Sequence, residues 1–466
     1  MKFTIENVGP IKKSEMEFGD LTILCGKNNT GKTYITYNTF NFFDAIKYFL
    51  HIPVKNGEAE QLLKQGKLIL QLEPYFYNAN DYIKKSMMSW IKQEAAIQMA
   101  SHENLYKNIS MNLTLDKERL STILLGSDFS WSIQMTKNCS LKVSKNKNET
   151  NLKILLQNQT SDLPDIDVVN EQLEMIITAM IKSIIPDLFI ITCERTGAAA
   201  FRSTFVASRE IFAKQNADSK LIAEVYQKVD FRGYPRPMNK DLEFVVRFDE
   251  ASQYKSFIVD EHPEILQYFE EIINGKYQLV EPNIVKFIPN ETEIGLTTLE
   301  SSSSIRSLME LNFYLKHKAK KYQCLIIDEP ELNLHPEIQR KIARLLAMLI
   351  NSDIYVAITT HSDYIIREFD FMTRLYSNPD LAEKLGYNRD QLLKADRIKT
   401  YVTSPIGNTG KYELKEISVS EENGIESSSF DTSIEDMNFI QQAIQMGEVM
   451  SDDDFVFLDN NCGREQ

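Results

Sequence analysis

LTILCGKNNTGKT, residues 21–33, is an apolar strand that runs directly into a glycine-rich turn. Residues 34–50, YITYNTFNFFDAIKYFL, follow with the apolar spacing of a helix. Residues 26–33 match the pattern G-x-x-x-x-G-K-[ST] of a phosphate-binding loop, which lies between a strand and a helix. A chance match in a turn is the alternative, but the flanking elements favour the loop. The stretch therefore predicts an α/β fold built around a phosphate site.

The chemistry of such a loop assigns expected roles to its residues. Glycine lets the backbone wrap around phosphates so that N–H groups point inward, and the helix that follows aims its positive end at the same anion. Lys32 is expected to reach the β- and γ-phosphates, and Thr33 to bind Mg²⁺. The residues expected to contact the nucleotide are Gly26, Asn28, Asn29, Thr30, Gly31, Lys32 and Thr33.

A second apolar strand ends in two carboxylates within CLIIDEPELNLHP, residues 324–336. In an open α/β sheet, phosphates bind at the carboxyl ends of the strands, which is where this pair falls. We expect Asp328 to hold Mg²⁺ directly or through water, and Glu329 to orient or deprotonate the attacking water. An acidic turn at the end of a strand is the alternative interpretation.

Two further motifs fit the same site. YVAITTHS, residues 355–362, is another apolar strand, and its His361 lies 33 positions after Asp328. This histidine could contact the γ-phosphate, although a lone histidine is often only structural. Residues 301–306, SSSSIR, open a helix before the carboxylate strand, where Ser302, Ser303 and Ser304 could bind an anion or could simply cap the helix.

Composition limits the class of protein. The 466 residues carry a formal charge of -14, which lowers the expectation of sequence-blind binding to nucleic acid. No apolar run approaches the roughly 20 residues that span a bilayer, and MKFTIENVGPIKK lacks the apolar core of a secretory signal. The five cysteines form no CxxC pair and fit reduced thiols, so a cytoplasmic location without membrane contact is expected.

The order of patterns predicts four regions. Residues 1–50 and 285–400 read as two parts of one ATPase head, and residues 401–466 as short strands, a helix near DMNFIQQAIQM and a loosely held tail. Residues 51–284 read as an inserted α+β and helical region that partly contributes to the head. Within it, residues 121–137 and 140–157 favour strand pairs, and the absence of sustained heptads argues against a coiled-coil arm.

In this order, the phosphate loop, the serine run, IDEPELNLHP and ITTHS resemble the ABC-type ATPases of the SMC/RecF/OLD lineage. The resemblance covers the first 50 residues and roughly 285–370. CERTG, residues 193–197, also resembles a strand-end element of this group, and GIESSSFDTSIEDMNFI resembles the ends of such bacterial proteins. The resemblance to this lineage implies ATP and Mg²⁺ as cofactors and a homodimer or higher homo-oligomer. ATP at Lys32 of one copy would be capped by the serine motif of the other, with Glu329 as the hydrolytic residue and His361 as the switch histidine.

The departures from the family pattern narrow the expected function. Paired glycines of the usual signature are replaced by serines and Ile305-Arg306, which argues against a transporter subunit, and the glutamine loop cannot be placed. The 105 residues after His361 show neither a TOPRIM arrangement nor an HNH motif, and Asp452-Asp453-Asp454 reads as solvated charge.

The resemblance then points to the ATPase components of anti-phage systems such as PARIS and Septu, including retron-linked forms. These components would control a separately encoded effector, most simply a nuclease. The alternative is a DNA-maintenance ATPase that grips DNA on binding ATP, for which a basic stripe on the dimer would be needed. A scaffold that binds nucleotide without hydrolysis is a third class, disfavoured by the presence of both Glu329 and His361.

Overall fold

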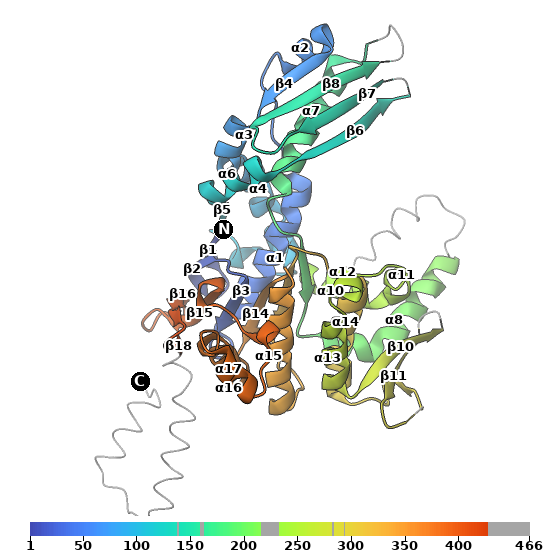
Figure 1. Cartoon of the computed structure of the whole chain (residues 1–466), viewed down its shortest axis with the longest axis vertical. Coiled ribbons are helices and arrows are strands. Elements are labelled where there is room, and N and C mark those ends of the chain that lie inside the picture. The colour runs from blue at the N-terminus through green and yellow to red at the C-terminus, as the bar shows by residue number, and fades with distance from the viewer. Residues whose placement is uncertain (138, 159–162, 216–232, 282–283, 293, 427–466) are drawn as a thin grey trace, which may run out of the picture.

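The computed structural model describes residues 1–137, 139–158, 163–215, 233–281, 284–292 and 294–426. It has three parts, which Figure 1 shows as a central body, an arm above it and a lobe beside it. The helix expected near DMNFIQQAIQM, the acidic run at Asp452 and Cys462 lie outside the described residues.

A nine-stranded mixed sheet forms the centre of the body. In spatial order its strands are β5 (Ser110–Thr114), β1 (Lys2–Val8), β2 (Ile11–Glu17), β16 (Tyr412–Ile417), β15 (Ile398–Pro405), β3 (Leu21–Cys25), β14 (Tyr355–Thr360), β13 (Cys324–Asp328) and β9 (Leu188–Ile191). The five strands from β15 to β9 are parallel. The fold class is α/β, as the phosphate-loop pattern predicted.

The parallel strands are covered on both faces, which explains why β3 and β13 are buried along their whole length and are mostly apolar. Successive side chains of a strand point to opposite faces. Accordingly Ile326 packs in the core that contains α1 (Lys32–Phe49), while Leu325 and Ile327 pack in the core of α15 (Pro336–Asn351) and α16 (Asp363–Arg374). The two cores hold the sheet between helices and bring the carboxyl ends of β3, β13 and β14 to one edge.

The arm is a four-stranded antiparallel sheet backed by helices (Figure 1). Its strands lie in the order β4 (Lys67–Gln71), β8 (Asn151–Asn158), β7 (Cys139–Lys145) and β6 (Phe129–Thr136), with α2 (Glu58–Gln65) and α7 (Ile166–Lys182) behind them. The helices α3 (Glu73–Tyr77), α4 (Ala79–Gln93) and α5 (Ala95–Gln98) join it to the body.

The strand pairs expected in this region are confirmed in part. Residues 121–126 were expected to be strand, but they belong to α6 (Lys117–Gly126). The Asp116 side chain accepts a hydrogen bond from the Arg119 N–H at 3.0 Å and caps this helix. Leu120 and Leu124, four residues apart, then bury one helical face, which the short apolar run did not distinguish from a strand.

The lobe is mainly helical. Its elements are α8 (Arg195–Gln215), α10 (Arg236–Val246), α11 (Phe248–Ala251), α12 (Phe257–Glu261), α13 (Pro263–Ile273), β10 (Gly275–Glu281), β11 (Ile284–Pro289), β12 (Leu296–Thr297) and α14 (Ser303–His317). A further helix, α17 (Pro379–Lys384), and the strands β17 (Val419–Ser420) and β18 (Gly424–Ile425) complete the body. Among the described helices, none is long and apolar enough to cross a membrane.

The aromatic cluster between α1 and its neighbours gives a test of the fold. Phe42 is fully buried between Phe3 and Trp90, with ring centroids 5.0 and 6.1 Å away. Truncation would leave a cavity, so Phe42→Ala is expected to lower the free energy of unfolding by about 3–5 kcal/mol. Tyr48 lies on the same helix with 68% of its surface exposed, and Tyr48→Ala is the matched control, expected to change stability by no more than about 0.5 kcal/mol. Denaturant unfolding followed by circular dichroism measures both, and equal losses would contradict the described packing.

Candidate functional site

The loop after β3 takes its shape from glycines that no other residue could replace. Gly26 has φ 138°, and a Cβ there would lie 2.1 Å from Thr403 Oγ1 on β15. Gly31 has φ 97°, and its Cβ would lie 2.6 Å from Ile11 Cδ1. Positive φ and close approach both require glycine. The loop is therefore pressed between β15 and the β1–β2 turn, with α1 starting directly after it.

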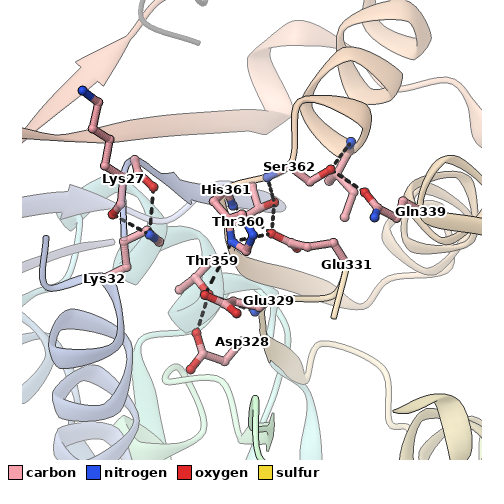
Figure 2. Close-up of polar contacts among 12 residues, drawn as sticks. Lys27, Lys32, Asp328, Glu329, Glu331, Gln339, Thr359, Thr360, His361 and Ser362 are labelled. Atoms are coloured by element: carbon pink, nitrogen blue, oxygen red, sulfur yellow. Dashed lines mark hydrogen bonds and ion pairs between the residues drawn. The ribbon is translucent and has the colours of Figure 1, made fainter. Parts of the chain in front are cut away.

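Lys32 lies across the mouth of this loop. Its Nζ donates hydrogen bonds to the carbonyl oxygens of Gly26 at 2.8 Å and Lys27 at 2.9 Å (Figure 2). Burial lowers the pKa of the ammonium, while the nearby carboxylates of Glu329 and Asp328 oppose that shift. The ammonium is thus held between the loop and the carboxylates. Thr33, the expected Mg²⁺ ligand, is exposed in the first turn of α1.

Asp328 is the buried carboxylate of the site. Its side chain accepts a hydrogen bond from the Thr359 hydroxyl through one oxygen, and the other oxygen has no hydrogen-bond partner among the described residues. Burial raises the pKa of this carboxyl group, and the Thr359 hydrogen bond opposes the shift. A buried acceptor without a partner is costly. The free oxygen is therefore suited to a cation or to water bound by one.

Glu329 has an unusual backbone. Its φ is 50°, a left-handed conformation that costs a non-glycine residue about 1–3 kcal/mol. The conformation is held by the Glu329 N–H, which donates to Thr359 O at 3.2 Å and Thr359 Oγ1 at 3.0 Å. Backbone strain of this kind is typical of functional sites. Here it turns the carboxylate of Glu329 toward His361.

His361 lies between two glutamates at the end of β14 (Figure 2). Its Nδ1 is 3.5 Å from Glu329 Oε1 and 3.2 Å from Glu331 Oε1. The same Glu331 oxygen accepts hydrogen bonds from the Thr360 hydroxyl and the His361 N–H, both at 2.8 Å. No role was predicted for Glu331 from the sequence, although it belongs to the DEPE run of residues 328–331. Glu331 therefore holds the backbone of His361, and together with Glu329 it contacts the His361 imidazole.

No role was predicted for Arg195 either, although it belongs to the CERTG motif of residues 193–197. It is 2% exposed, and its guanidinium donates to the Asp328 carbonyl at 2.8 Å, the Glu329 carbonyl at 2.5 Å and the Ser307 hydroxyl at 3.1 Å. An arginine four residues after the end of an apolar strand was the available signal, because a buried arginine needs several acceptors. Arg195 thus holds the backbone of the carboxylate turn.

The serine run lies at the start of α14. Ser302 is the N-cap residue: its hydroxyl accepts from the Ile305 N–H at 3.3 Å and lies 2.8 Å from the Ser304 hydroxyl. Ser303 is exposed. Within the described part of the chain, no hydrogen bond or ion pair joins these serines to the phosphate loop. The single chain therefore brings together Lys32, Asp328, Glu329 and His361, and leaves the serine motif apart from them.

The fold and the loop define a P-loop protein of the α/β class. A family model described as AAA ATPase domain matches residues 1–366, so the chain belongs to this family. No match is found among curated proteins.

Solved structures with an overall likeness include three SMC heads. An SMC head bound to the C-terminal winged-helix domain of ScpA has 10% identity and a TM-score of 0.37, covering 90% of this chain and 97% of that one. A Pyrococcus furiosus SMC head with an extended coiled coil, bound to the C-terminal domain of ScpA, has 11% identity, a TM-score of 0.33 and coverages of 94% and 98%. The SMC head of Thermotoga maritima has 9% identity, a TM-score of 0.31 and coverages of 90% and 98%.

The glutamates around His361 make its titration a test of the geometry. The hydrogen bond with Glu329 raises the pKa of His361, burial opposes this, and the charge of Glu331 adds to it. The imidazole should therefore keep its proton to higher pH than a free histidine. In the metal-free protein, Glu329→Gln and Glu331→Gln should each lower the pKa of His361, as followed by NMR of the ring protons.

His317 provides the control for this titration. Burial lowers its pKa, and its Nδ1 lies 2.7 Å from the Tyr254 carbonyl, away from both glutamates. Its titration should not change in either variant. An unchanged His361 titration in both variants would contradict the described site.

Proposed function

We propose that this protein binds ATP with Mg²⁺ and hydrolyses it in an ABC-type site shared between two copies of the chain. The observation that carries the proposal is the convergence of Lys32, Asp328, Glu329 and His361 at one sheet edge. Four polar groups of the types that phosphoryl transfer requires meet there, beside a loop built for phosphates.

The proposed role of each site residue follows from its position. Lys32 would exchange its two carbonyl partners for phosphate oxygens, because a buried ammonium binds an anion more strongly than a neutral acceptor. Thr33 and the free oxygen of Asp328 would hold Mg²⁺, which neutralises charge on the β- and γ-phosphates when bound. Glu329 would orient or deprotonate the attacking water, and His361 would contact the γ-phosphate.

A second copy is proposed because the serine motif lies apart from the phosphate loop of its own chain. Ser303 and Ser304 stand at the start of a 15-residue helix, whose first N–H groups favour an anion. In a two-fold pair, each surface meets its counterpart reciprocally, so two shared sites form together. ATP at Lys32 of one copy would then be capped by the serines of the other.

Loss of the Glu329 carboxylate tests the hydrolytic role. Glu329→Gln should lower phosphate release by on the order of 10²–10⁴-fold, because a positioned acid–base group contributes that much. Bound ATP should then persist and trap the pair, which mass photometry with and without ATP-Mg²⁺ detects. If both proteins stay monomeric and hydrolyse equally, the role of Glu329 is refuted.

A mixture of two inactive variants tests whether the site is shared. Lys32→Ala disables the phosphate loop and Ser303→Arg obstructs the serine motif, so each protein alone should be inactive. In a mixed pair one site receives both intact elements, and an equal mixture should recover about a quarter of wild-type phosphate release. The control is Ser303→Arg alone, at the same total protein concentration as the mixture. No recovery in the mixture would indicate a site within one chain.

For the biological role, we propose control of a separately encoded effector, as the sequence resemblance to anti-phage ATPases suggests. The DNA-gripping alternative has one observation in its favour. Lys47, Lys182, Lys320 and Lys321 line a hollow of about 490 Å³ at the base of the arm. Two of them are paired, Lys47 with Asp187 and Lys321 with Glu261, which weakens the positive field. Duplex DNA added to the trapped Glu329→Gln pair separates the candidates, since retention at physiological salt would favour DNA as the partner.

A further inference from the structure

We propose that Arg195 and Ser307 couple the serine-bearing helix α14 to the backbone of Glu329, so that the position of this helix sets the position of the hydrolytic carboxylate. The inference rests on the proposed function and adds a positioning pair to it. Neither residue contacts the phosphate loop through a hydrogen bond in the described part of the chain. Both act through the turn that carries Asp328 and Glu329.

The first support is the geometry of the guanidinium. One terminal nitrogen donates to the Asp328 carbonyl and the other to the Glu329 carbonyl, while Nε donates to the Ser307 hydroxyl. The guanidinium is planar and rigid, so its donors cannot move independently. A shift of Ser307 relative to Arg195 is therefore transmitted to both carbonyls. Because Arg195 is buried, water cannot readily replace these acceptors.

The second support is the strained backbone of Glu329. Its N–H is held by Thr359 of β14, and its carbonyl is held by Arg195. The peptide groups on both sides of a left-handed residue are thus restrained by different elements. Release of the carbonyl side lets the residue relax toward ordinary backbone angles, and its carboxylate then moves away from His361. The strain makes the position of the carboxylate sensitive to Arg195.

The third support is the placement of Ser307 on α14. Ser307 follows Ser303 by four residues, so the two lie one turn apart on the same helical face. Its hydroxyl accepts from Arg195 and donates to the Leu332 carbonyl at 2.9 Å. Ser307 therefore joins α14 to the far end of the carboxylate turn as well. A partner that engages the serine motif would act on a rigid helix whose next turn is linked to the Glu329 carbonyl through Arg195.

Buried carboxyl groups surround this arginine and decide which variant tests the proposal best. Asp241 accepts hydrogen bonds from the Thr192 N–H and hydroxyl, and Glu310 of α14 is fully buried next to it. Burial raises the pKa of both carboxyl groups, and Arg195 opposes the shift. Loss of the arginine charge would disturb this pair as well. Ser307→Ala, which removes only a hydroxyl, is the cleaner change.

The experiment compares Ser307→Ala with Ser256→Ala. Ser256 is also a buried serine bonded to α14, but its hydroxyl donates to the Leu315 carbonyl at the other end of the helix. Ser307→Ala should lower kcat by roughly 10- to 100-fold, because a misplaced catalytic group costs that much. The Kd for ATP, the ATP-dependent pair and the melting temperature should match those of Ser256→Ala. A loss in kcat without a loss in binding is the signature of a positioning role.

A second matched pair covers the case in which Ser307→Ala is less stable than its control. Arg195→Lys keeps the charge but cannot reach both carbonyls and Ser307 together, whereas Arg202→Lys changes another buried arginine of α8, which donates to the Val245 carbonyl. Arg195→Lys should lower kcat at an unchanged Kd for ATP, and Arg202→Lys should not. Equal kcat values in target and control variants would overturn the coupling. Absence of hydrolysis by the wild-type chain would contradict the proposed function itself.

Discussion

The register of three parallel strands determines the site. Strands β3, β14 and β13 lie side by side, with Cys25 opposite Thr360 and Asp328 opposite Thr359. Because side chains alternate across a sheet, a slip of one residue would send Asp328 to the other face. The correct register places the start of the phosphate loop, both carboxylates and His361 at the same edge. The register is secured by strands that are buried and packed between two cores.

At this edge of the sheet, the phosphate loop and the carboxylate turn are held in different ways. The phosphate loop is free of side-chain obstruction at Gly26 and Gly31, where nearby atoms leave no room for a Cβ. The carboxylate turn is instead held by side chains from other elements, namely Thr359 and Arg195. The shape of the loop depends on the absence of side chains at Gly26 and Gly31, whereas the shape of the turn depends on its hydrogen bonds with Thr359 and Arg195. A change far from the loop can therefore affect the carboxylates without affecting the loop.

The sequence predicted the parts of this site whose chemistry lies in a contiguous motif. The strand–loop–helix at residues 21–50, the strand ending at Asp328 and the strand before His361 were all placed correctly. Glu331 and Arg195 were not assigned roles, because a carboxylate or guanidinium shows its partners only after folding. The helix at residues 117–126 was taken in part for a strand, since a short apolar run fits both periods. The pairing of β15 with β3 joins segments far apart in the chain, and no local pattern could reveal it.

That pairing has a consequence for how the chain folds during synthesis. Strand β3 is made early, yet its two neighbours in the sheet, β14 and β15, come from the last third of the described chain. Pairing between such distant segments is slow, because a long loop must close first. The nascent N-terminal strand must wait until residue 405 has left the ribosome before it is enclosed on both sides. Thr403, which closes against Gly26, arrives at the same late stage. A chain that ends before Thr403 therefore lacks one side of the phosphate loop.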